Sequence, residues 1–182
     1  MKRRYLPLIL ICCLMLTGCG DSSARDGVEK FCAQTAEKEE LGFTGRIRCE
    51  YDDKTVSFTL DTHADAEGCT VSIVEPELVR GISARIAAGE TSLEYEGLHL
   101  DTGALDIYGL CPMSALPLLI DTIKEGYIDT VWEEGGQYAA LIVPSDTLSV
   151  QLWLDKYTLE PVHAEFISDG KVRIFADISN WY

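Results

Sequence analysis

The sequence has few basic residues for its size. Its 182 residues include 15 lysines and arginines against 30 aspartates and glutamates, which gives a formal charge of −15 at pH 7. Proteins that bind nucleic acid phosphates need a basic patch or stripe. A chain this acidic is therefore not expected to bind nucleic acid, and anionic lipid headgroups repel it.

The motifs of several common enzyme classes are also missing. No serine lies in a GxSxG elbow and no GxxxxGK[ST] loop occurs, so hydrolase-fold and P-loop chemistry lack support. There is no CxxC pair, and no histidine lies near the widely spaced cysteines, so a zinc site is not indicated. We expect no catalytic residue, no metal and no cofactor, and the prediction is that the protein is not an enzyme.

Long hydrophobic runs are absent except for one near the start. Residues 5–16 are almost wholly apolar, interrupted by Pro7, and follow the basic residues Lys2, Arg3 and Arg4. The run is too short for a permanent membrane-spanning helix, which needs roughly 20 apolar residues. A basic start, a short apolar run and small residues after it are typical of a secretory signal peptide.

The segment Leu16-Thr17-Gly18-Cys19 resembles the lipobox of bacterial lipoproteins. That resemblance implies cleavage after residue 18 and a diacylglycerol group on Cys19, and so an exported protein that is lipid-anchored to the outer face of the bacterial cell membrane. An ordinary cleaved signal and an uncleaved N-terminal anchor are the alternatives. Loss of residues 1–18 removes Lys2, Arg3 and Arg4 and changes the formal charge from −15 to −18. Attachment of the protein to the membrane then depends on the acyl chains of Cys19. We expect the protein to be a monomer.

The exported part is predicted to be one domain. Residues 19–26 read as a polar tether and residues 27–182 as a domain of ordinary size. This domain contains Cys32, Cys49, Cys69 and Cys111. Export to an oxidising compartment allows a disulfide among them. Cys49 and Cys69, however, fall at the apolar positions of alternating strands, which equally favours buried thiols. Four cysteines allow three pairings, and the sequence does not choose among them.

Two segments have the periodicity of helices. Asp26 and Glu29 resemble a helix-capping pair before an apolar stripe at Val28, Phe31, Cys32 and Thr35, which predicts a helix over 27–41 that Gly42 ends. Residues 111–126 predict a second helix with a stripe at Leu116, Leu119, Ile120 and Ile123. Ser114 is its expected cap, Pro117 would lie in its first turn, and Gly126 would end it.

The rest of the chain alternates with a period of two. Apolar and polar residues alternate from Phe43 to Tyr51, and again in about ten further runs that end in Gly, Pro, Asp or Glu-Gly. This pattern is typical of an antiparallel meander with one apolar face. So many amphipathic strands can form a sandwich, a closed barrel or a curved open sheet covered by helices. The two apolar helices favour the last, so we predict an α+β fold in which about eleven strands form a curved antiparallel sheet with both helices on its concave side.

The layout is similar to that of the LolA/LolB superfamily, which contains lipoprotein-localisation factors and related bacterial lipoproteins. The resemblance lies in the leader, the N-terminal helix, the segments VEPELVRGISARI (74–86) and LEYEGLHLD, and the CPMSALPLLI helix. It covers most of residues 27–180. It implies an unclosed β-barrel with a hydrophobic cavity that shelters acyl chains.

Other candidate chemistry has a simpler structural interpretation. Asp101-Thr102-Gly103 resembles the active loop of retropepsin-like peptidases, which would require a homodimer to pair two carboxylates, but it also makes a good strand-ending turn. His99 and His163 fall on polar strand phases, and His63 lies in an acidic segment that we interpret as a turn. Asp61, Asp65 and Glu67 lack EF-hand spacing and favour a solvated turn over a calcium loop.

The apolar set remains as the functional candidate. The residues expected to face the concave side are Phe58, Leu60, Val71, Ile73, Ile82 and Ile86 of the sheet and Leu116, Leu119, Ile120 and Ile123 of the second helix. Alternation shows which face is buried but not whether it holds a ligand, and Trp132 and Trp153 could line a mouth or belong to the core. Our main hypothesis is a lipoprotein that binds an acyl chain or a lipoprotein's lipid. An envelope interaction module with a solid core and a dimeric peptidase acting through Asp101 are the alternatives.

Overall fold

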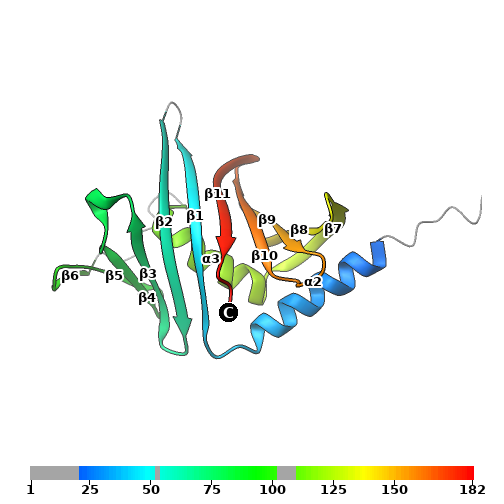
Figure 1. Cartoon of the computed structure of the whole chain (residues 1–182), viewed down its shortest axis with the longest axis horizontal. Helices are drawn as coiled ribbons and strands as arrows, with labels where there is room; N and C mark the ends of the chain where they lie inside the picture. Colours follow the sequence, from blue (N-terminus) through cyan, green and yellow to red (C-terminus); the bar gives the residue numbers. More distant parts are fainter. Residues whose placement is uncertain (1–20, 52–53, 102–109) are drawn as a thin grey trace, which may run out of the picture.

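The computed structural model describes residues 21–51, 54–101 and 110–182. Cys19, and the Thr102 and Gly103 of the peptidase-like motif, lie outside the described residues. The described chain forms eleven strands and two α-helices (Figure 1). Its strands are β1 (Leu41–Tyr51), β2 (Lys54–Asp65), β3 (Gly68–Glu75), β4 (Ser83–Ala87), β5 (Glu90–Tyr95), β6 (Leu98–Asp101), β7 (Tyr127–Glu134), β8 (Gln137–Ser145), β9 (Leu148–Asp155), β10 (Pro161–Ser168) and β11 (Lys171–Ser179).

All eleven strands belong to one antiparallel sheet. Its order is β6-β5-β4-β3-β2-β1-β11-β10-β9-β8-β7, so two consecutive meanders meet where β1 pairs with β11. β6 and β7 are the two edges of the sheet, which is not closed into a barrel. The predicted α+β fold with an unclosed sheet is confirmed.

The hairpin turns explain why the strands reverse where they do. Gly135 and Gly136 between β7 and β8 have φ of 59° and 82°, and Asp169 and Gly170 between β10 and β11 have φ of 51° and 70°. Two consecutive positive φ angles are the requirement of the two-residue turn whose twist matches that of the flanking strands. Glycine or aspartate at these positions therefore sets the register of both hairpins.

Helix α3 (Pro112–Glu125) connects the two meanders and packs in the hollow of the sheet. It contacts β1, β2 and β3 of the first meander and β8 of the second (Figure 1). Its N-cap is Cys111 rather than the predicted Ser114, whose Oγ instead accepts a hydrogen bond from the Cys111 N–H at 3.2 Å. Pro112 occupies the first helical position, where a missing N–H costs little. Pro117 consequently lies beyond the first turn, and Gly126 ends the helix as predicted.

Helix α2 (Asp21–Ala36) packs against β7, β8 and α3. It starts at Asp21 and ends at Ala36, rather than running from 27 to 41, so residues 21–26 are helical and Gly42 lies in β1. The fully buried Ala24 extends the apolar stripe of Val28 and Phe31 one turn back toward the N terminus. Gly27 lies against the Tyr138 ring, where a Cβ would come within 2.7 Å of Cε2.

Candidate functional site

The concave face of the sheet is identified by which side chains are buried. Along β1, Leu41, Phe43, Ile47 and Cys49 are buried while Arg46, Arg48 and Glu50 are exposed. Residues opposite one another in an antiparallel pair share a face. Pairing therefore assigns the inward positions of every neighbouring strand, and these form one continuous apolar layer with the two helices.

Helix α3 is seated on the middle of the sheet. Leu116 is fully buried and lies over Gly45 of β1, where a Cβ would be 2.7 Å from Leu116 Cδ1. Because Gly45 has no side chain, the helix approaches the strand closely at this point. Leu119 and Ile123 are buried in the same layer.

Most of the predicted apolar set lies in this layer. Seven members are buried and belong to the core cluster: Leu60, Val71, Ile73, Leu116, Leu119, Ile120 and Ile123. Phe58 and Ile82 are half-buried against that cluster, and Ile86 is half-buried on the same face, opposite Cys69. The structure brings the set together; a ligand-binding role for it stays a prediction.

The apolar face continues beyond the part that α3 covers. One row of paired residues runs Thr62, Val71, Ala84, Leu93, Leu100 across β2 to β6. Val71 and Ala84 are fully buried, Leu93 is half-buried, and Leu100 is 62% exposed. The concave layer therefore changes from protein core to accessible apolar surface within one row.

Tyr95 and Leu98 extend this accessible surface. They form a pair next to Leu93 and Leu100, and alternation puts them on the same face. Leu98 is 74% exposed and Tyr95 is exposed as well. We call Leu93, Tyr95, Leu98 and Leu100 the open arm. The sequence interpretation placed these residues in strands but not in the site, because only the register shows that they share a face with Val71.

The hollows on the surface of the described residues include four with volumes of about 270, 470, 380 and 370 Å³. Polar and charged residues make up most of the lining of three of these four, while the 380 Å³ hollow also has Leu141, Val143, Leu148 and Ile167. Phe58 is the one member of the predicted set that lines any of the four. Asp101 lines the 470 Å³ hollow with Arg85 and Ser92 at the end of β6.

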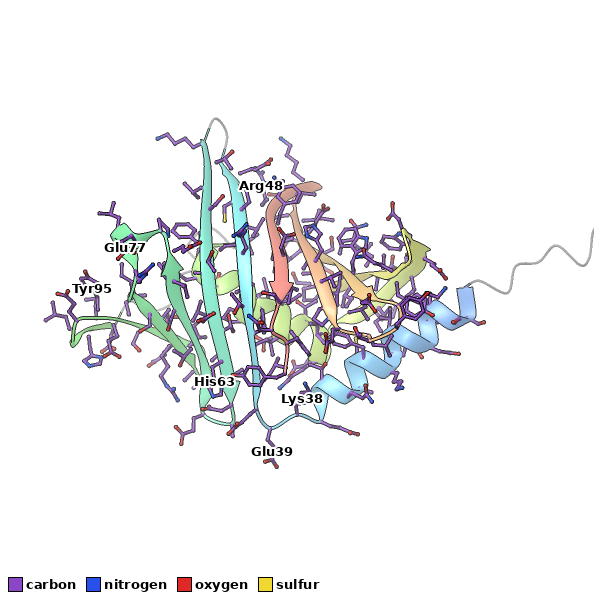
Figure 2. All side chains as sticks on the ribbon, in the orientation of Figure 1. Lys38, Glu39, Arg48, His63, Glu77 and Tyr95 are labelled. Carbon is purple, nitrogen blue, oxygen red and sulfur yellow. The ribbon has the colours of Figure 1, made fainter. Side chains whose placement is uncertain are left out.

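His63, His163, Trp132 and Trp153 do not face the concave layer. His63 lies within β2 rather than in a turn, because alternation there continues to Asp65 (Figure 2). Trp132 and Trp153 pair through Ala139 on the outer face, with ring centroids 6.5 Å apart, and so line neither a concave mouth nor the core. His163 lies beside Trp153 and within 2.8 Å of Asp177 on the same outer face.

The acidic segment near Gly68 includes a side-chain-capped turn. Asp65 Oδ1 accepts hydrogen bonds from the N–H groups of Glu67 and Gly68, at 2.8 and 3.1 Å. Asp61 points outward from β2 and accepts from Thr44. Within the described ranges, no group of three or more His, Cys, Asp or Glu residues is arranged to hold a metal ion.

Two thiols of the described chain, Cys32 and Cys69, are poor nucleophiles. Cys32, Cys69 and Cys111 are free. Burial, followed by the charges of Asp121 and Asp65, raises the pKa of Cys69 to about 12, and burial raises the pKa of Cys32 to about 11. Both side chains are therefore neutral at physiological pH. Burial and the neighbouring Glu125 also raise the pKa of Asp121 on α3.

Comparisons with known proteins identify the fold. No protein-family model matches the chain, and no curated protein matches it. It is similar to a domain from Vibrio parahaemolyticus described as an outer-membrane lipoprotein-sorting protein, at 13% identity and a TM-score of 0.50 over 87% of this chain and 92% of that one. A LolA superfamily protein from Nitrosomonas europaea matches at 13% identity and a TM-score of 0.47, over 87% and 92% of the two chains. The lipoprotein LppX from Mycobacterium tuberculosis matches at 12% and 0.45, over 88% and 96%.

The chain thus has a LolA-like fold, an open antiparallel half-barrel whose hollow holds a helix. None of its helices in the described ranges is long and apolar enough to cross a membrane.

Proposed function

We propose that this protein is a lipoprotein, anchored through Cys19, that binds an acyl chain of a lipid or lipoprotein on its concave face. The exposure gradient from Val71 to Leu100 is the observation that carries this proposal. A monomer has little reason to leave leucines 62% and 74% exposed on the continuation of its own core, and such a patch is typical of a binding surface.

An apolar tail would lie along the open arm and against the half-buried Ile82 and Ile86. The buried members of the predicted set would form the floor beneath it, with Val71 and Ala84 where the tail meets the core. Binding needs no covalent step, because removal of apolar surface from water contributes roughly 25 cal/mol per Å². The anionic character of the chain disfavours a negatively charged headgroup near the site.

The experiment uses the full chain with Cys19→Ala, which cannot carry its own acyl chains. Native mass spectrometry of the purified protein should show a co-purified hydrophobic molecule, and a polarity-sensitive dye should bind saturably. Leu98→Glu combined with Leu100→Glu should abolish both signals, because two carboxylates would then lie in the path of the tail. Leu78→Glu is the matched control, since Leu78 is 91% exposed on the 3₁₀ turn Glu77–Val79.

Protein that carries no lipid and binds no dye would refute ligand binding. It would leave the interaction module with a solid core as the remaining hypothesis. Equal loss of binding in the Leu78→Glu control would mean that added charge, rather than the open arm, determines the signal.

A further inference from the structure

The hollow of about 270 Å³ lies on the opposite face of the sheet from the apolar layer. It sits where β1 begins and β2 ends, beside residues 180–182 that follow β11, and Figure 2 shows His63 at this end of the sheet. Its lining includes Thr44, Asp61, His63, Ser72, Asn180 and Tyr182. None of these is used by the proposed acyl-chain site.

The wall formed by residues 180–182 is held in place from the inside. Asn180 has a φ of 55°, which redirects the chain after β11. Trp181 then packs inward, with its ring 4.9 Å from that of Phe43 and 5.7 Å from that of Phe31. The N–H of Tyr182 donates to the Gly42 carbonyl at 3.0 Å, and the N–H of Gly42 donates to the main-chain oxygen of Tyr182 at 3.4 Å.

Tyr182 provides a flat aromatic platform. A Cβ on Gly42 would lie 2.1 Å from Tyr182 Cζ, so the ring lies directly over the backbone of Gly42. The side chain is nevertheless 63% exposed. One face of the ring is therefore fixed against the sheet while the rest remains accessible from the hollow.

A short hydrogen-bonded chain orders the polar groups beside that ring. Thr44 Oγ1 donates to Asp61 Oδ1 at 2.8 Å, and Asn180 Nδ2 donates to Thr44 Oγ1 at 3.3 Å. His63 lies two residues after Asp61 on β2 and so on the same face, and Ser72 is the β3 partner of Asp61. The hollow thus combines fixed acceptors and donors with an aromatic surface.

We propose that this hollow binds one hexopyranose ring of a neutral saccharide. Such a ring has C–H groups on one face, which stack on an aromatic side chain, and hydroxyl groups at its rim that both donate and accept. Asp61 would accept from one hydroxyl while the Asn180 amide donates to a neighbouring one. The volume is near the lower limit of ligand pockets, roughly 300 Å³, which suits a single ring. Its described lining contains no lysine or arginine, and Asp61 repels anions, so phosphorylated sugars are excluded.

The test is an amide NMR titration of the Cys19→Ala chain with glucose, N-acetylglucosamine and its soluble trimer. We expect saturable shifts at Gly42, Asp61 and Tyr182, with millimolar dissociation constants. Tyr182→Ala and Asp61→Asn should each weaken binding about tenfold, equivalent to about 1.4 kcal/mol. Tyr157→Ala is the control, because Tyr157 is 90% exposed in the turn after β9 and should leave binding unchanged.

Three results would overturn the proposal. The first is that no neutral sugar causes saturable shifts. The second is that neither Tyr182→Ala nor Asp61→Asn changes the dissociation constant. The third is that glucose 6-phosphate or choline binds more tightly than the neutral sugars. Asp61→Asn keeps the shape of the side chain, so its result stands even if Tyr182→Ala disturbs folding. Co-sedimentation with purified peptidoglycan identifies the source: pelleting points to wall glycan, and soluble binding alone points to a free saccharide.

Discussion

The contact between Gly45 and Leu116 determines how close α3 lies to the sheet, and it can be tested by a double-mutant cycle. A Cβ at Gly45 would be 2.7 Å from Leu116 Cδ1 and 3.0 Å from Cδ2. Overpacking of this kind costs about 1–3 kcal/mol, while replacement of a strand glycine by alanine returns about 0.5–1 kcal/mol. We therefore expect Gly45→Ala to destabilise the protein by about 1 kcal/mol.

Leu116→Ala should cost about 2–5 kcal/mol, because the side chain is fully buried in the core. It also removes both atoms that the Gly45→Ala methyl group would meet. In the Leu116→Ala background, Gly45→Ala should then be neutral or stabilising, which corresponds to a coupling energy of about 1–3 kcal/mol.

Urea unfolding of the Cys19→Ala chain measures these differences, with an unchanged m-value as the condition for comparing them. Leu152→Ala is the matched control, because Leu152 is equally buried but lies on β9, three strands from β1 in the sheet order. Its cost should add to that of Gly45→Ala within about 0.5 kcal/mol. Additive costs for Gly45→Ala and Leu116→Ala would show that α3 is not seated on Gly45, and the reasoning about the concave layer would fail.

Three further predictions concern individual side chains. The pKa of Cys69 is about 12 instead of 9.0, so at pH 8 its thiolate fraction should be about a thousandfold lower than that of an ordinary cysteine. Peptide mapping should therefore show slow alkylation of Cys69 by iodoacetamide in the native protein and normal alkylation in urea. The folded-state pKa lies above the unfolded one, so this thiol should also make the protein less stable as the pH rises above about 9. Asp121→Asn should raise the melting temperature slightly at pH 7, because partial desolvation of this still exposed side chain and the charge of Glu125 disfavour the ionised carboxylate. The gain should disappear as acidification protonates Asp121 in the wild type, and an equal gain at low pH would contradict this. Tyr138→Phe removes the hydroxyl that lies 3.1 Å from Ser23 Oγ and keeps the ring, so it should lower the free energy of unfolding by about 0.5–1.5 kcal/mol. If the two groups interact only with each other, adding Ser23→Ala should lower it no further.

The strands were predictable because alternation with a period of two is a local property. Phe43, Ile47 and Cys49 face inward in β1, as the pattern indicates, and the Gly-containing turns end the strands where expected. The unclosed sheet followed from the number of amphipathic strands together with two apolar helices. The pairing of β1 with β11 joins residues far apart in the sequence, and no local pattern encodes it.

The bounds of α2 were wrong for a physical reason. Ala24 is too small to count as an apolar anchor in the sequence, although it is fully buried and begins the helical stripe. At the other end, Glu37, Glu39 and Glu40 place negative charge where the helix dipole disfavours it, so the helix ends before Gly42.

Trp132 and Trp153 show that alternation can place a large aromatic side chain on the outer face of a sheet. Trp153 shares its strand phase with Ser149 and Gln151, and the opposite phase of β9 contains the buried Val150 and Leu152. The alternation alone would have placed Trp153 on the outer face. The register shows that Trp132 belongs on the same face, so the outer face holds both residues that were expected at a mouth or in the core.

Whether the concave layer is filled or open depends on the reach of α3, which no pattern in the strands reveals. The row from Val71 to Leu100 is equally apolar along its length, yet one end is core and the other is accessible. The same alternation that directs Phe43 toward the helices directs Thr44 toward Asp61 on the outer face. Because adjacent residues of one strand serve opposite faces, the acyl-chain site and the saccharide site would be separated by the thickness of the sheet. The side chains proposed to contact the acyl chain differ from those proposed to contact the saccharide, so the two proposals can fail independently.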